Sequence, residues 1–229
     1  MPSAMGKEGS DIVKDLRALP SEELSQGFAR ILAGDVTHAL QRLENADTQT
    51  HRREAIRTIF AAVEGVVWMY REHVLKAAKD LGRLTPLEEF AIQEKIYSVG
   101  ERGDLVEQAR FIPLTTMVRL TTKIAKEACP EFDIDFSHVG WANLKSAIAI
   151  RNRLTHPKSH ADLSIRHDEV LIARSGFFWL LALVIEGMAA ANNEIAVFTR
   201  QARELMARME RGDQAVIDEY RSAAASIDD

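Results

Sequence analysis

The chain has 229 residues, of which 46% are hydrophobic and 28% charged, a composition typical of soluble globular proteins and not of disordered ones. Only 12 glycines and 6 prolines are available for turns, which argues against an all-β sandwich. The formal net charge of −5 argues against a protein that coats nucleic acid over its whole surface, although it allows a local basic patch. The single cysteine, Cys129, excludes an internal disulfide and favours a reducing, cytoplasmic location.

Export and membrane segments are not expected. Residues 1–10 lack the apolar core of a signal peptide. The most apolar run, residues 176–185, is shorter than the roughly 20 residues that cross a bilayer.

The spacing of apolar residues predicts helices along almost the whole chain. After a flexible leader over residues 1–20, Ser21 is expected to begin a first helix that continues past Leu43. A long second helix is predicted over residues 50–81, and Gly82 is expected to end it because glycine accepts the left-handed backbone found just after many helices.

A capping box is the next signal in the chain. Thr85, Pro86 and Glu88 have the residue types and spacing of a helix start, and we expect the helix that follows to reach Gly100. Residues 101–110, rich in charge and glycine, are predicted to form a loop.

Two further helices precede the charged segment of greatest interest. The first begins near Pro113 and ends before Pro130. The second is expected to be capped by Ser137 and to stop at His156, because Pro157 disfavours the helical conformation in the residue before it.

The C-terminal part is predicted to contain one core helix and a polar helical tail. Residues 158–167 are predicted to form a loop, and an alternation of apolar residues there makes a short strand the alternative. Asp168 begins a helix that is apolar on all faces, as expected of a helix at the centre of a fold or at a subunit seam. Residues 198–226 are predicted to form a helix pair that is broken at Gly212.

The end of the helix before Pro157 has the residues best suited to chemistry. Arg151 continues the apolar stripe of Leu144 and Ile148, so it points toward a packed surface, where a cation needs a partner or a ligand. Asn152 and His156 are four residues apart and share a helix face, which would let the amide orient the imidazole. Further positive charge follows in Arg153, Lys158 and His160.

An arginine, a polar residue directly after it and a histidine five positions after the arginine, on a late helix of an all-helical domain, resemble the HEPN superfamily. Arg151, Asn152 and His156 match this motif, and residues 50–190 match the layout loosely. The resemblance implies an all-α fold, an HEPN-like helical bundle with additional N- and C-terminal helices.

The domain limits expected from this reading are a leader over residues 1–20, the helical domain over residues 21–195 and a helical tail over residues 196–229.

The resemblance also implies a function. HEPN proteins are commonly metal-independent endoribonucleases of toxin–antitoxin, antiphage and RNA-processing systems, and their motifs usually meet across a homodimer interface. The chain is thus expected to bind RNA, with Arg153, Lys158 and His160 as possible RNA-binding residues, and to form a homodimer. It is expected to need no cofactor or metal and to have no membrane partner. An antitoxin or a nucleotidyltransferase is a possible further partner. His156 would act as general base or acid and Arg151 as phosphate clamp, producing 2′,3′-cyclic phosphate ends. The alternative is a non-catalytic HEPN module that binds a nucleotide or a partner in a defence or regulatory complex.

Other interpretations of the same residues stay open. The motif spacing also runs from Arg153 to His160, although leucine and not a polar residue follows Arg153. His156 also suits a structural place at the negative end of a helix dipole. Arg151 would equally suit a structural ion pair, for which the candidate partners are Glu64, Glu72 and Glu186.

Two more charged groups have ordinary explanations. The histidines and aspartates over residues 156–168 contain metal-ligand types, but Pro157 prevents His156 and His160 from forming a helical pair of ligands. A basic helix start is expected to be a solvated face or, alternatively, an auxiliary RNA-binding strip; it comprises His51, Arg52, Arg53 and Arg57.

Overall fold

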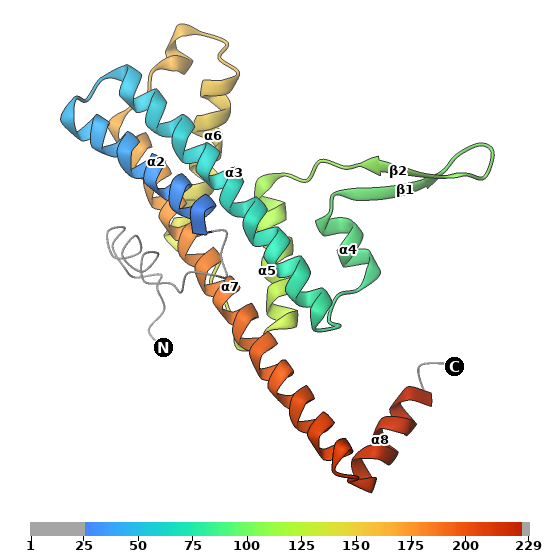
Figure 1. Cartoon of the computed structure of the whole chain (residues 1–229). Coiled ribbons are helices and arrows are strands. Elements are labelled where there is room, and N and C mark those ends of the chain that lie inside the picture. Colours follow the sequence, from blue (N-terminus) through green and yellow to red (C-terminus); the bar gives the residue numbers. More distant parts are fainter. Residues whose placement is uncertain (1–25, 226–229) are drawn as a thin grey trace.

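A computed structural model describes residues 26–225, and within them the fold is helical apart from one two-stranded hairpin (Figure 1). The expected all-α class is therefore confirmed in its main feature. The leader over residues 1–20 and the helix start at Ser21 lie outside the described residues. The elements are α2 (Gln26–Asn45), α3 (Gln49–Asp80), α4 (Pro86–Ile92), β1 (Lys95–Val99), β2 (Leu105–Ala109), α5 (Leu114–Ala128), α6 (Val139–Thr155), the 3₁₀ helix η2 (His160–Leu163), α7 (His167–Glu210) and α8 (Gln214–Ala225).

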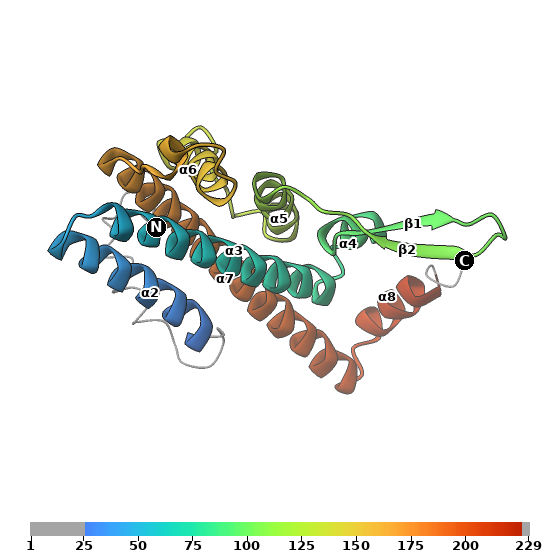
Figure 2. The ribbon, with the colours of Figure 1, turned by 90° about the horizontal axis from the view of Figure 1, so that it is seen from above.

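Helix α3 matches its prediction to within one residue at each end. Thr48 caps its start by accepting a hydrogen bond from the backbone N–H of His51. Gly82 follows its end with φ +65°, in the left-handed region where glycine avoids the steric cost of a side chain. This long helix lies beside α2, α5 and α7 and forms the spine of the core (Figures 1 and 2).

The segment after Thr85 departs from the prediction. The capping box between Thr85 and Glu88 is present, but α4 ends at Ile92 and the chain continues as the antiparallel pair β1–β2, not as a helix to Gly100 and a loop. Glu94 has φ +58°, which stops the helical path. The β-branched and aromatic residues of β1 then favour an extended chain. The hairpin projects from the body (Figure 1).

The start of α6 also differs from the prediction. Ser137 does not cap the helix, because its hydroxyl and its N–H both donate to the carboxylate of Asp135. The ring Nδ1 of His138 accepts from the N–H of Gly140 instead, at 3.0 Å. The other end matches the prediction, since α6 ends at Thr155 and His156 is its C-terminal cap.

Helices α6 and α7 cross closely, and this crossing fixes the position of the end of α6. A Cβ atom placed on Gly176 of α7 would lie 2.7 Å from the backbone of Leu144 in α6, so only glycine fits. Residues 158–167 between the two helices contain η2 and no strand. Ile165, fully buried, holds this connection against the start of α3, where Gln49 and Arg52 bond its backbone.

The first half of α7 is a central, buried helix, as the sequence predicts. Phe177, Leu180, Leu183 and Val184 are fully buried within one chain. The helix is long and apolar enough to cross a membrane, but 61% of its most apolar window is buried inside the fold, as in the core helix of a soluble protein. It continues without a break through residue 196 to Glu210, beyond the body, and Gly212 then separates it from α8 (Figure 1).

Candidate functional site

The predicted residues Arg151, Asn152 and His156 occupy the last turn of α6. The guanidinium of Arg151 donates to the side-chain oxygen of Asn152 at 3.1 Å. The backbone N–H of His156 donates to the carbonyl of Asn152 at 3.0 Å, and both Asn152 and His156 are exposed. Asn152 therefore orients the arginine, whereas no hydrogen bond joins its amide to the imidazole within residues 26–225.

Arg151 lies in the seam between α3 and α6, as its place on the apolar stripe predicts. Its side chain is 35% exposed and pairs with Glu64, one of the three partners foreseen. Its guanidinium also lies over the ring of Phe60, with 5.8 Å to the centroid. Because half of the Glu64 side chain is exposed, the pair contributes little to stability, and a phosphate that offers two oxygens can replace Glu64.

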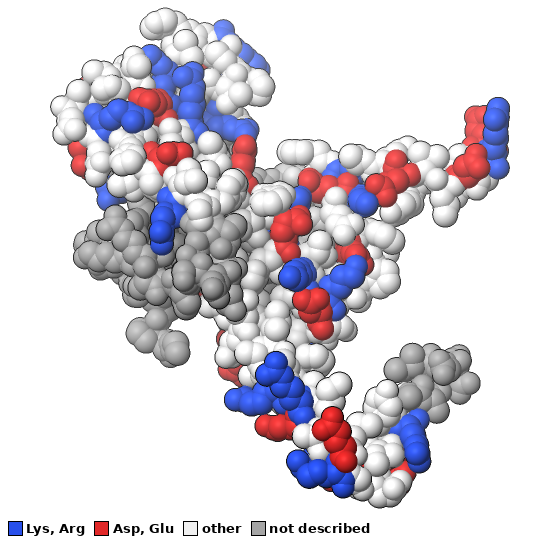
Figure 3. Space-filling view, viewed as in Figure 1, with Lys and Arg blue, Asp and Glu red and all other residues white. Residues whose placement is uncertain are grey.

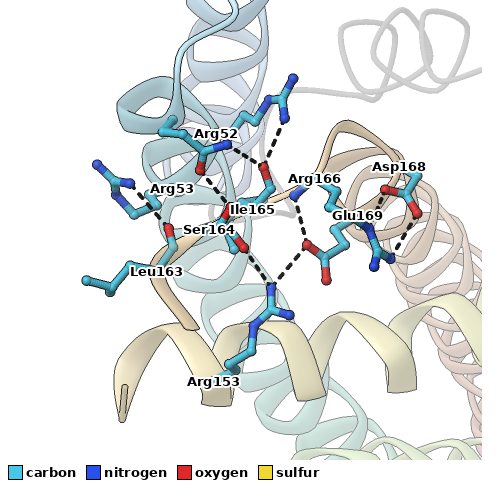
Figure 4. Close-up of polar contacts among 10 residues, drawn as sticks. Arg52, Arg53, Arg153, Leu163, Ser164, Ile165, Arg166, Asp168 and Glu169 are labelled. Atoms are coloured by element: carbon cyan, nitrogen blue, oxygen red, sulfur yellow. Dashed lines mark hydrogen bonds and ion pairs between the residues drawn. The ribbon is translucent and has the colours of Figure 1, made fainter. Parts of the chain in front are cut away.

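Arg153 has a structural role in the connection between α6 and α7 (Figure 4). Its guanidinium donates to the carboxylate of Glu169 at 3.0 Å and to the carbonyl of Ser164 at 3.2 Å. The Glu169 side chain is only 5% exposed and also accepts from the backbone N–H of Arg166. A buried carboxylate that depends on one arginine holds that arginine in place, so Arg153 is poorly placed to serve as a mobile phosphate clamp.

A shallow pocket of about 480 Å³ lies beside the exposed face of the α6 terminus. His156 and Asn152 line it together with Arg153, Lys158 and Asp162. The backbone N–H of Lys158 and the hydroxyl of Ser159 lower the pKa of Asp162, which holds the loop in one shape. His160 is exposed on η2 and is not among the residues that line the pocket.

The basic start of α3 is mostly tied into the fold. Arg52 pairs with Asp47. It also bonds the carbonyl of Ile165, while Arg53 bonds the carbonyl of Leu163 (Figure 4). The hydrogen bonds from Arg52 lower the pKa of Asp47. Arg57 is exposed and has no ion pair among the described residues. Figure 3 shows Lys and Arg side chains gathered over this start of α3 and the end of α6.

The other histidines of this region are dispersed. His167 faces Asp47 at 3.6 Å and is not among the residues that line the shallow pocket. In residues 26–225 no group of three or more His, Cys, Asp or Glu side chains is placed to hold a metal ion.

A second, more enclosed cavity of about 440 Å³, which Arg151 lines, was not foreseen from the sequence. It is formed by α3, α5, α6 and the base of the hairpin, and Asn152 borders both hollows. Its aromatic lining includes Trp68 and Phe111, both exposed. Their one sequence signal is that each is a large apolar residue outside a predicted buried stripe.

No protein family, curated protein or solved structure matches this chain.

Proposed function

We propose that the chain is a metal-independent endoribonuclease of HEPN type, with Arg151, Asn152 and His156 as its active residues. One observation carries the proposal: on one helix end, Asn152 orients Arg151, which lines one hollow, and also borders the neighbouring pocket that exposed His156 and Lys158 line. These are the groups that cleavage of an RNA phosphodiester requires. The proposed fold is an HEPN-like helical bundle with additional N- and C-terminal helices.

The reaction that fits these residues is an internal transfer of the phosphate. Neutral His156 takes the proton of a 2′-hydroxyl, whose oxygen then forms a bond to the adjacent phosphorus. The bond from phosphorus to the 5′ oxygen breaks, and that oxygen leaves with the proton that protonated His156 returns as general acid. Arg151 neutralises the charge that develops on the phosphoryl oxygens. The products are a 2′,3′-cyclic phosphate and a 5′-hydroxyl, and DNA is not cut because it lacks the 2′-hydroxyl.

Glu64 gives this mechanism a resting state. In the free protein it neutralises Arg151, which prevents an unpaired cation in the seam between α3 and α6. RNA binding exchanges the carboxylate of Glu64 for the phosphate. Lys158 then adds a long-range attraction at the rim of the pocket.

A homodimer in the cytoplasm is part of the same proposal, as is an antitoxin or nucleotidyltransferase partner. A helix that is apolar on all faces would suit a subunit seam, but a single chain already buries the central residues of α7, such as Phe177 and Leu181. A dimer would therefore use another surface and would bring two copies of the α6 terminus around one groove.

The alternative is a non-catalytic module that binds a nucleotide or a partner. The ion pair between Arg151 and Glu64 favours it, because the arginine already has a structural partner.

The deciding experiment is cleavage of a mixed-sequence RNA in EDTA. We expect wild-type protein and His160→Ala to cut it, and His156→Ala to cut it at least about 100-fold more slowly, as for the loss of a general base. Cleavage that needs added Mg²⁺ or Mn²⁺ would contradict the metal-independent mechanism. If the activity is lost in His160→Ala and kept in His156→Ala, the motif runs from Arg153. If no RNA is cut, the non-catalytic alternative holds.

A further inference from the structure

The more enclosed cavity, which Arg151 lines, has the dimensions and lining of a small-molecule site. Its volume of about 440 Å³ falls within the range of about 300–1,000 Å³ that is usual for ligand pockets. Its walls are mostly apolar and come from four separate elements, while a few charged groups converge at its rim. This combination is typical of a site that takes a flat, partly polar ligand.

Two exposed aromatic side chains border the cavity. Trp68 on α3 is 52% exposed, and Phe111, in the connection from β2 to α5, is 85% exposed. Large aromatic groups in water are costly unless a partner covers them, and nucleobases are partners that stack on such rings. In the free protein Trp68 is supported by Phe28, whose ring meets it edge to face at 6.1 Å.

The base of the hairpin is held rigidly against the cavity. Glu94 accepts from the N–H of Ile112 at 2.9 Å and from Arg71 at 3.2 Å, and its carbonyl accepts from Arg110. Its left-handed backbone, φ +58°, is a strain that these bonds maintain. The arrangement fixes the connection that carries Phe111 beside α3.

The charged groups at the rim match the edges of guanine. Guanine has two adjacent acceptors, O6 and N7, which suit an arginine, and two adjacent donors, N1–H and N2–H, which suit a carboxylate. The cavity offers Arg71 as a donor and Glu64 as an acceptor. Arg71 also bonds Glu94 and Glu72, and each of its two terminal nitrogens keeps one further N–H for a ligand. When a phosphate takes Arg151, the carboxylate of Glu64 loses its cation and becomes free to accept both guanine donors.

We propose that this cavity binds a guanine base, stacked against Trp68 and Phe111 and recognised by Glu64 and Arg71. The proposal rests on the proposed function for its second half: the guanine would belong to a nucleotide next to the phosphate held by Arg151, so cleavage would occur beside guanines.

The test uses the intrinsic fluorescence of the whole chain. Trp141 and Trp179 are buried, with 3% and 4% exposure, so a base stacked on Trp68 quenches the one tryptophan that a ligand can reach. We expect guanosine 5′-monophosphate to quench the wild type and to bind at least about 5-fold more tightly than adenosine or uridine 5′-monophosphate, the lower limit for one bidentate contact. In Trp68→Phe the quenching should vanish.

Variants separate stacking from recognition. Calorimetry should show that Trp68→Ala and Phe111→Ala each weaken guanosine monophosphate binding by about 5-fold or more, as for the loss of a stacked ring. Phe111 is so exposed that its removal cannot unfold the chain, and Phe198→Ala, a half-exposed ring on the distal part of α7, is the matched control. Glu64→Gln should reduce the preference for guanine over adenine, because an amide presents both a donor and an acceptor.

The outcomes distinguish the two proposals. Quenching without guanine preference, or binding that is unchanged in Phe111→Ala, would overturn the guanine site. If the wild type cuts RNA in EDTA but guanosine monophosphate neither binds nor quenches, the guanine site is wrong and the ribonuclease proposal stands. If guanosine monophosphate binds as described and no RNA is cut, the guanine site stands and the assignment of Arg151 and His156 is wrong.

Discussion

Arg151 combines a structural and a chemical position, because its guanidinium contacts Glu64 and Phe60 on α3 and also the amide of Asn152 on its own helix. The first contacts hold the seam between α3 and α6, and the last one orients the planar fork toward the α6 terminus. The two roles respond differently to lysine, which keeps the charge but not the fork.

We expect Arg151→Lys to lose most cleavage activity while its free energy of unfolding changes by about 0.5 kcal/mol or less, as for most half-exposed sites. The lysine can still pair with Glu64, but it cannot bind two phosphoryl oxygens in one plane. Steady-state kinetics on a short RNA and thermal unfolding measure the two effects. Normal cleavage by the lysine variant would show that Arg151 is not the phosphate clamp. A large loss of stability would show that its role is structural.

Sequence reasoning reached the residues of α6 but not those of the second cavity. The half-burial of Arg151 and its need for an acidic partner followed from helix periodicity and charge, which are local properties, whereas the choice of Glu64 among three candidates needed the structure. Trp68 and Phe111 meet at one cavity only because the hairpin returns the chain to α3, and no local pattern carries that information.

At the scale of elements, the long helices were predictable and the hairpin was not. Helix α3 has a regular apolar stripe, a capping threonine and a terminal glycine, so every local signal agrees. In β1 and β2, by contrast, almost every residue is exposed, and no alternation of buried and exposed residues marks the strands. Their pairing is stabilised across the hairpin and at its base, by contacts that a helix-by-helix reading does not see.

The close crossing of α6 and α7 makes a prediction about stability. Gly176→Ala should lower the free energy of unfolding by about 1–3 kcal/mol, because the added methyl group meets the backbone of Leu144, which cannot move aside alone. Gly34→Ala in α2 is the matched control, since nothing lies within 4 Å of its added Cβ. That control should stabilise the chain slightly, by up to about 1 kcal/mol. Thermal unfolding of both variants gives the comparison, and equal signs would refute the close packing.

The capping box of α4 makes a prediction about pH. The hydroxyl and the N–H of Thr85 lower the pKa of Glu88 to about 2. A folded-state pKa below the ordinary one means that the charged Glu88 contributes stability above about pH 5, and that this contribution is lost as the pH falls toward 2.

We therefore expect Glu88→Gln to lower the melting temperature at pH 7 by about 2–4 °C, the effect of about 1 kcal/mol in a chain of this size. The difference from wild type should shrink steadily between about pH 5 and pH 2. Glu101→Gln, at the exposed turn of the hairpin, should show no such trend. Calorimetry across this pH range is the measurement, and a difference that stays constant would argue against a charged cap.

At the scale of the whole molecule, assembly is the first question. We expect sedimentation equilibrium at micromolar concentration to give a dimer, because the proposed site is completed by two copies of the α6 terminus. Since α7 buries Leu180 and Val184 within one chain, its central stretch should not form the seam. A monomer at these concentrations would contradict a composite site while leaving the single-chain guanine site unaffected.

The division of α7 into a packed and an exposed half predicts unequal hydrogen exchange. Amide protons over residues 170–190, where α7 packs on α3 and α6, should exchange only with global unfolding. Those over residues 200–210, where most side chains are exposed, should exchange orders of magnitude faster although the helix is continuous. Mass spectrometry resolves the two stretches, and uniform protection would show that another surface covers the distal half.

Helix α7 is continuous, but its packed half and its exposed half are expected to unfold as two separate cooperative units. The boundary lies near Glu194, which Arg83 at the end of α3 binds at 2.6 Å, and beyond it the helix has little packing apart from α8. The packed half of α7 positions the α6 terminus, and both are expected to unfold together with the core. The distal unit can therefore be lengthened, shortened or exchanged for another segment with almost no cost to the residues around Arg151, which makes it the part of the chain most open to evolutionary replacement.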